Sequence, residues 1–225
     1  MKAMILAAGR GERMRPLTDH CPKPLLEVAR RPLIVWHLER LAAAGFRDVV
    51  INHAHLGEQI EARLGNGSEW GLAIRYSAEP PGALETAGGI VNALPLLGDD
   101  TFLVINGDIF CDWDLGKARG LLLHETLAYL VMVPNPAHHP DGDFSLIEGK
   151  VGVSGTATRC TFAGIGIYRA ALFAHLPRGA PAKLAPLIRQ AMDSGAVSGE
   201  MYSGRWVDVG TPERLAALDT EIRSL

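Results

Sequence analysis

The segment LAAGRGERMRPLT, residues 6–18, follows an apolar run that begins the chain, and residues 2–8 are typical of a buried strand that ends at glycine. Two glycines and three arginines then fall close together, at Gly9, Gly11, Arg10, Arg13 and Arg15. Glycine lets backbone N–H groups approach an anion, and arginine supplies forked donors that match phosphate oxygens. A strand, a glycine-rich turn and cations at the carboxyl edge of a parallel sheet therefore predict a phosphate-binding loop.

Two common phosphate-binding motifs do not fit this loop. A dinucleotide fingerprint needs a third glycine, and Met14 occupies that position, while the pattern G-x-x-x-x-G-K-[ST] occurs nowhere in the chain. The remaining interpretations are a phosphate-binding loop of another design or a solvated turn whose arginines only aid solubility.

Strand and helix patterns alternate outward from the loop as far as about residue 112. Apolar runs predict strands at residues 48–54, 72–79 and 101–107, and helical spacing predicts helices at residues 32–45, 55–65 and 84–97. This alternation predicts an α/β fold with a largely parallel sheet.

The pattern is less regular after residue 112. We expect strands at residues 127–133 and 161–168, a hairpin over 144–153, helices at 170–176 and 183–192, and two strands within 197–210. Thr211 and Pro212 favour the cap and first position of a last helix. No linker separates the halves, so residues 1–225 are predicted to form one domain, with a nucleotide-binding half of about 1–112 and a sugar-binding half of about 113–225.

Composition excludes several classes of protein. The 225 residues carry a net charge of −3, which gives no basic field to hold nucleic acid. No apolar run reaches the roughly 18 residues of a membrane span, and the apolar start is shorter than a signal peptide needs. The three cysteines show no C-x-x-C spacing, so we expect a cytoplasmic protein without a nucleic-acid or membrane partner.

Lys23 and two aspartates are the further candidates for phosphate chemistry. Lys23 stands between Pro22 and Pro24, which predicts an extended segment with no helix to bury or pair the ammonium. Asp108 ends a buried strand, and Asp208 lies among apolar residues, where an unpaired charge would be costly. A tight turn that exposes Asp108, or a backbone contact of Asp208 near the last helix, is the alternative.

The loop and the PKPL segment that follows it resemble the sugar-nucleotide pyrophosphorylases. The signature of that family reads L-A-[AG]-G-x-G-x-R-[LM]-x-P-[LM]-T and then P-K-P-[LM], and this chain departs mildly, at Ala8 and Glu12, where many members have glycine and threonine. The resemblance implies a Rossmann-like nucleotide-diphospho-sugar transferase fold, with a mixed, mostly parallel central sheet flanked by helices.

The same resemblance implies an activity and a set of site residues. It implies an Mg²⁺-dependent uridylyltransferase acting on UTP and a sugar 1-phosphate, with Arg15 and Lys23 as catalytic residues and Asp108 and Asp208 as metal ligands. The implied nucleotide-binding residues are Ala8, Gly9, Gly11, Glu12, Arg13, Lys23, Glu79, Glu85 and Gly88. Asn106 and Asp143 are implied for the sugar phosphate, while His138 and His139 are expected to be loop residues.

Two other functions remain open at this point. One is another enzyme of the family, such as a guanylyltransferase for mannose or heptose 1-phosphate, and the other is a sugar-nucleotide sensor without catalysis. No nucleophilic side chain is needed for the transferase, because a sugar 1-phosphate is itself largely dianionic at neutral pH, with a second pKa of about 6. The number of subunits is left undetermined.

Overall fold

The structure, a computed structural model, describes residues 1–80, 84–121, 126–153 and 158–224. Four strands of the N-terminal half lie parallel in the order β5-β4-β1-β6. These strands are β1 (Lys2–Leu6), β4 (Asp48–His53), β5 (Ala73–Ala78) and β6 (Thr101–Asn106). The helices between them are α1 (Leu33–Ala43), α2 (Gly57–Leu64) and α3 (Glu85–Leu97). Each lies where the sequence predicts it.

The side chains of the central strands point alternately to two hydrophobic cores. Ala3 and Ile5 of β1 belong to the core that α1 and α2 cover, together with Leu38 of α1. Met4 belongs to the opposite core, with Ile90 of α3. This alternation follows from the two-residue period of a strand, and it explains why the strand is apolar throughout.

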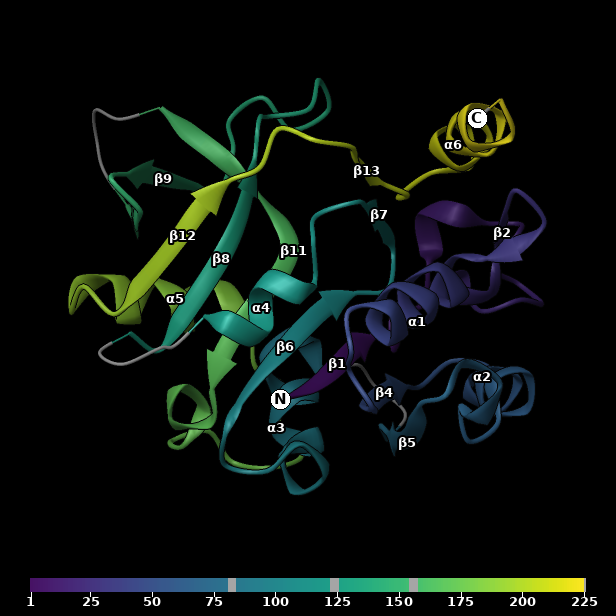
Figure 1. The fold of residues 1–225 in the computed structure, drawn as a ribbon, viewed down its shortest axis with the longest axis horizontal. Coiled ribbons are helices and arrows are strands. Elements are labelled where there is room, and N and C mark those ends of the chain that lie inside the picture. Colours follow the sequence, from purple (N-terminus) through teal and green to yellow (C-terminus); the bar gives the residue numbers. More distant parts are fainter. Residues whose placement is uncertain (81–83, 122–125, 154–157, 225) are drawn as a thin grey trace.

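The second half continues the same sheet with antiparallel and parallel neighbours (Figure 1). Its strands are β8 (Ala128–Val133), β9 (Phe144–Ile147), β10 (Lys150–Gly152), β11 (Arg159–Arg169) and β12 (Val197–Met201). Strand β11 runs antiparallel to both β6 and β8, and β12 runs parallel to β8. Both halves thus contribute to one mixed sheet, and the expected hairpin is formed by β9 and β10.

Two expectations for the second half were only partly right. A short 3-10 helix, η4 (Ala170–Phe173), replaces the predicted helix over residues 170–176. The two strands expected within residues 197–210 exist, but they belong to different sheets: β12 joins the main sheet, whereas β13 (Trp206–Asp208) pairs with β7 (Ile109–Cys111). The predicted helix over residues 183–192 is α5 (Leu184–Asp193).

The last helix, α6 (Pro212–Arg223), returns to the beginning of the chain. The hydroxyl of Thr211 accepts a hydrogen bond from the N–H of Arg214, and Pro212 opens the helix, as the sequence predicts. The N–H of Ala29 donates to Asp219 over 2.7 Å, and Figure 1 shows α6 beside the small sheet of β2 (Glu27–Val28) and β3 (Arg31–Pro32).

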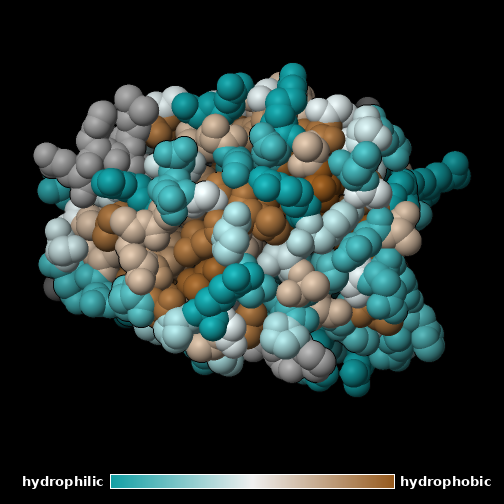
Figure 2. Space-filling view, turned by 90° about the horizontal axis from the view of Figure 1, so that it is seen from below, coloured by the Kyte–Doolittle hydropathy of each residue, from teal (hydrophilic) through white to brown (hydrophobic). Residues whose placement is uncertain are grey.

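Short helical segments complete the structure. They are η1 (Glu12–Met14), η2 (Lys23–Leu25), η3 (Ser68–Trp70) and α4 (Gly116–Gly120). Among the described residues, every helix is too short or too polar to span a bilayer. Figure 2 shows a hollowed band of apolar residues across the face seen from below in the view of Figure 1, bordered by hydrophilic residues.

Candidate active site

Three cavities meet at the carboxyl ends of β1, β4 and β6. The first has a volume of about 290 Å³ and contains the end of β1 with Ala8 and Gly9, and the second, of about 360 Å³, contains the end of β13. The third, of about 300 Å³, lies between α3, β11 and the start of α5. Asn106, the last residue of β6, lines all three cavities. A ligand in one of these spaces is therefore next to a ligand in another.

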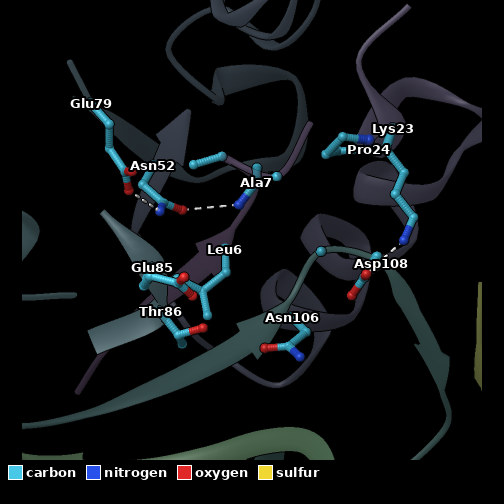
Figure 3. A pocket seen from close by; sticks show the side chains of 13 residues that line it. Leu6, Ala7, Lys23, Pro24, Asn52, Glu79, Glu85, Thr86, Asn106 and Asp108 are labelled. Atoms are coloured by element: carbon cyan, nitrogen blue, oxygen red, sulfur yellow. Dashed lines mark hydrogen bonds and ion pairs between the residues drawn. The ribbon is translucent and has the colours of Figure 1, made fainter. Parts of the chain in front are cut away.

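An asparagine that the sequence analysis did not single out organises the first cavity. The side-chain oxygen of Asn52, at the end of β4, accepts a hydrogen bond of 2.9 Å from the N–H of Ala7. Its amide nitrogen donates over 2.6 Å to Glu79 Oε1 (Figure 3). Asn52 therefore fixes the start of the glycine-arginine loop and orients the carboxylate of Glu79 on the opposite wall.

The turn after β6 touches the end of β1 through backbone alone. The N–H of Gly107 donates to the carbonyl oxygen of Leu6 over 2.8 Å. A Cβ atom on residue 107 would lie only 2.6 Å from that oxygen, so no side chain fits here. Glycine at this position thus lets the turn carry the next residue, Asp108, up to the loop.

Lys23 is buried and paired, which corrects the expectation of an extended, unpaired segment. It begins the 3-10 helix η2, and only 7% of its surface is exposed. Its Nζ lies 2.6 Å from Asp108 Oδ2, and both residues line the first cavity (Figure 3). The proline on either side did not prevent a helical turn, because one turn of 3-10 helix accepts proline near its start.

Asp208 comes from the other half of the chain to the same place. Strand β13 pairs with β7, and the N–H of Val209 donates to the backbone oxygen of Asp108 over 2.9 Å. Both carboxylates line the second cavity. Asp208 Oδ2 also lies 2.8 Å from Arg214 Nη1 and 3.3 Å from His138 Nε2, so it is held by these side chains rather than by the backbone of α6.

The donors at this point suit a hard divalent cation. Asp108, in the turn between β6 and β7, and Asp208, at the end of β13, offer carboxylate oxygens, and Asn106 adds an amide oxygen at the same cavity. Among the described residues, no group of three or more histidine, cysteine, aspartate or glutamate side chains could hold a metal by itself. Mg²⁺ typically takes one or two carboxylates and completes its shell with substrate phosphates and water, so the residues fit that ion.

The glycine-arginine loop only partly faces the cavities. Ala8 and Gly9 line the first cavity, and Arg13 lines the second. Arg15 lines none of the three, and its side chain is 65% exposed and pairs with Asp19 over 3.3 Å. Gly11 and Glu12 also lie outside these linings.

The three later residues implied for nucleotide binding, Glu79, Glu85 and Gly88, divide into residues that line a cavity and one that packs. Glu79 and Glu85 line the first cavity. The N–H of Gly88 donates instead to the carbonyl of Ala182 over 3.1 Å, and Gly88 lines none of the cavities. Residues 81–83, between the predicted strand over 72–79 and the predicted helix over 84–97, lie outside the described residues.

Asp143 lines the third cavity together with Asn106. Its Oδ2 accepts a hydrogen bond of 2.8 Å from the N–H of Phe162, and its Oδ1 lies 3.2 Å from His139 Nε2. The carboxylate therefore holds the loop of His138 and His139 against β11, and it stays close enough to the cavity to meet a ligand.

A buried histidine lies beneath the Asp108 turn. His37 of α1 is 2% exposed, and neither of its ring nitrogens has a hydrogen-bond partner of normal geometry among the described residues. Burial lowers the pKa of His37 to about 4, and the nearby Arg40 guanidinium adds to that effect. The imidazole is thus neutral at physiological pH.

The sequence analysis missed several residues that line or support the cavities. These are Asn52, Thr86, His138, Tyr168, Lys183 and Arg214. The sequence offered one signal: Asn52, like Asn106, is a polar residue near the end of an apolar run. In the structure both residues pair in register with Leu6.

Comparison with known proteins places this arrangement in a class. The family model described as "Nucleotidyl transferase" matches residues 2–148, and the chain belongs to the nucleotidyl transferase family. The resemblance to the sugar-nucleotide pyrophosphorylases is thereby confirmed.

Two relatives match over nearly their whole length. The N-acetylmuramate alpha-1-phosphate uridylyltransferase of Neisseria meningitidis serogroup B is 56% identical over 96% of this chain and 95% of that protein. The protein of the same name from Caulobacter vibrioides is 35% identical over 98% of this chain and 96% of its own.

A solved structure confirms the predicted fold. The crystal structure of a putative glucose-1-phosphate thymidylyltransferase from Bacillus anthracis, in complex with a sucrose, matches with a TM-score of 0.86. The match covers 100% of this chain and 96% of that chain. Because the identity is 22%, it supports the fold alone.

Proposed function

We propose that this protein transfers a uridylyl group from UTP to N-acetylmuramate α-1-phosphate, giving UDP-N-acetylmuramate and pyrophosphate. The observation that carries the transferase chemistry is the convergence of Lys23, Asp108 and Asp208 where the first and second cavities adjoin. The choice of UTP and of this sugar rests on the two near-full-length relatives, whose names state that activity.

In the proposed complex, UTP occupies the first cavity and its phosphates lie on the loop. The backbone at Ala8 and Gly9 faces that cavity, and Arg13 faces the second cavity, where the leaving pyrophosphate would lie. Glu79 and Glu85 face the base and ribose, and Asn52 keeps Glu79 in place. Arg15 would have to leave Asp19 to reach the phosphates.

The sugar 1-phosphate enters from the third cavity, which Asn106 and Asp143 line. An oxygen of its phosphate attacks the α-phosphorus of UTP, one P–O bond forms, and the P–O bond to the pyrophosphate breaks. Because the attacking group is already anionic, the protein has to position it and balance charge, and no general base is required. Lys23 supplies positive charge within hydrogen-bonding distance of Asp108.

Asp108 and Asp208 would hold Mg²⁺ in this proposal. When bound there, the ion would supply positive charge that offsets the negative charge developing during transfer. In the described structure Asp108 is paired with Lys23 and Asp208 with Arg214, so each acid already has one positive charge beside it.

A reaction of this kind returns a cell-wall sugar to the precursor pool, and we therefore place the protein in peptidoglycan recycling in the cytoplasm. The absence of any membrane-spanning helix among the described residues is compatible with this assignment.

A panel of substrates tests the proposal. The protein is incubated with Mg²⁺, one of UTP, GTP or dTTP, and N-acetylmuramate, mannose or heptose 1-phosphate, while pyrophosphate release is followed and products are weighed by mass spectrometry. We expect product only from UTP with N-acetylmuramate α-1-phosphate. Turnover of GTP with mannose or heptose phosphate would identify a guanylyltransferase instead. Binding of a sugar nucleotide without pyrophosphate release from any pair would indicate a sensor.

A further inference from the structure

A buried hydroxyl in the wall of the third cavity has no partner. Tyr168 of β11 is 1% exposed, and its Oη makes no hydrogen bond with any described residue. Tyr168 nevertheless lines the cavity. A buried hydroxyl without a hydrogen bond is costly, so a polar atom that reached it from the cavity would be stabilised by this hydroxyl.

The hydroxyl is directed along β11 toward the site. It lies above Gly166, where a Cβ atom would be only 2.3 Å from Tyr168 Oη. Gly166 pairs across the ladder with Leu130, which also lines the third cavity. The missing side chain at residue 166 therefore leaves room for the hydroxyl beside the cavity, while the ring packs against Phe102 and Phe173.

The start of α5 forms another part of the cavity wall and carries a lysine. Lys183, Leu184 and Ala185 all line the cavity. The N–H groups of the first two helical residues have no partner within a helix, and no described residue outside α5 accepts a hydrogen bond from them. Lys183 makes no ion pair with any described residue. The site thus offers unused donors and one positive charge.

Two acidic residues, Asp143 and Glu85, also line this cavity, and neither forms an ion pair with Lys183. Asp143 accepts from the N–H of Phe162 and contacts His139, so part of its hydrogen-bonding capacity is used within the fold. Glu85 lies where the third cavity adjoins the first, since it lines both. Between these acids the wall is apolar, with Phe144, Phe162 and Ile188.

We propose that the third cavity recognises the carboxylate of the lactyl ether on N-acetylmuramate through Lys183 and the N–H groups of Leu184 and Ala185. This inference rests on the proposed function and adds residues that distinguish that sugar from N-acetylglucosamine, which lacks the lactyl group. The hydroxyl of Tyr168 donates a hydrogen bond to a polar atom of the same bound sugar. The apolar wall accommodates the methyl group of the lactyl ether.

The first experiment compares two sugars in the same pyrophosphate-release assay. The value of kcat/KM is measured with UTP for N-acetylmuramate and N-acetylglucosamine α-1-phosphates, in wild-type protein, Lys183→Met and the control Lys150→Met, an exposed lysine of β10 that lines none of the cavities. We expect Lys183→Met to lower the muramate value by about 10- to 100-fold through KM, the effect of one charged hydrogen bond. The glucosamine value and both values of the control should stay unchanged.

The second experiment uses Tyr168→Phe, which removes only the hydroxyl. If the hydroxyl had a purely structural role, the sugar KM would not change; with the proposed role, the muramate KM rises about 3- to 10-fold. The thermal midpoint without ligand should stay the same or rise, because the variant loses a buried group without a partner. If the KM of Tyr168→Phe for N-acetylmuramate α-1-phosphate equals that of wild-type protein, the proposed role of Tyr168 is overturned.

The outcomes separate this inference from the proposed function. If wild-type protein uses both sugar phosphates equally well, or if Lys183→Met keeps the wild-type preference, the carboxylate is not recognised here and the inference is overturned while the uridylyl transfer stands. If wild-type protein releases no pyrophosphate from either sugar, the proposed function is overturned and this inference with it.

Discussion

The ammonium of Lys23 lies 2.6 Å from the carboxylate of Asp108, although 85 residues separate the two in the sequence. Lys23 is 7% exposed, whereas the Asp108 side chain is 39% exposed and faces two cavities. The lysine is therefore fixed in the wall, and the carboxylate keeps an accessible side for another cation.

Replacing Lys23 with alanine should lower kcat with UTP and the sugar phosphate by about 100-fold or more, comparable to the loss of one preorganised donor. In the proposed complex the positive charge is fixed beside the reacting phosphates, and a water molecule in its place would carry no charge. Pyrophosphate release measures the effect, and Lys150→Ala serves as the control. Normal turnover in Lys23→Ala would show that Lys23 is not part of the catalytic machinery.

Removing the second acid should alter the response to Mg²⁺. We expect Asp208→Asn to raise the Mg²⁺ concentration for half-maximal activity by about 10-fold or more, because one of the two charged ligands becomes neutral. The control is Asp99→Asn, an exposed residue that lines none of the cavities. An unchanged Mg²⁺ titration in Asp208→Asn would remove Asp208 from the proposed metal site.

Two glycine substitutions, one in the turn after β6 and one in the glycine-arginine loop, should affect stability and binding separately. Gly107→Ala should lower the free energy of unfolding by about 1–3 kcal/mol, because the new methyl would lie 2.6 Å from the backbone oxygen of Leu6 and cannot avoid it without moving backbone. Gly9→Ala should leave stability nearly unchanged, since no atom lies within 4 Å of its added Cβ. It should instead raise the KM for UTP, because Gly9 lines the first cavity. Urea unfolding and initial rates measure the two effects, and the opposite pattern would contradict this assignment.

Acid should weaken the fold through His37. Burial lowers the pKa of His37 to about 4 in the folded protein, whereas in the unfolded chain a histidine titrates near its ordinary value of about 6.5. The unfolded state then binds more protons, so His37 should reduce the free energy of unfolding by up to about 3 kcal/mol as pH falls from about 6.5 to 4.

Urea unfolding at a series of pH values from 7 to about 4 tests this contribution. In His37→Leu the dependence should be weaker by that amount, whereas His20→Leu, which replaces an exposed histidine, should behave as the wild type does. Parallel pH curves for His37→Leu and wild-type protein would show that the imidazole does not titrate as described.

The sequence predicted the parallel half of the sheet well because local periodicity determines those elements. Ile5 and Val104 each lie in a short apolar run that ends near a glycine. Such a run predicts a strand from the local sequence alone. The family resemblance extended this to the whole fold, which the structural comparison confirms.

Long-range pairing was beyond the sequence patterns. Lys23 is paired with Asp108, and β13 is paired with β7. Both partners are distant in the sequence, so the residues next to Lys23 or β13 could not predict these contacts. The roles assigned to Arg15 and Gly88 stay predictions, since the structure pairs Arg15 with Asp19 and directs the N–H of Gly88 to Ala182. The sequence pattern identifies Tyr168 only as a residue of a buried strand, and only the structure shows that its hydroxyl is buried without a partner among the described residues.

The short ladder between β7 and β13 has a consequence for how the protein matures. A nascent chain still on the ribosome, emerged only as far as β8, would already contain the whole phosphate-binding loop and Asp108. The second carboxylate follows Asp108 by 100 residues, so the proposed metal site would be complete only once β13 has been synthesised and paired with β7. A chain cut just before β13 would, by the same reasoning, lack the proposed metal site, although the buried residues of the two cores beside the main sheet all precede the cut.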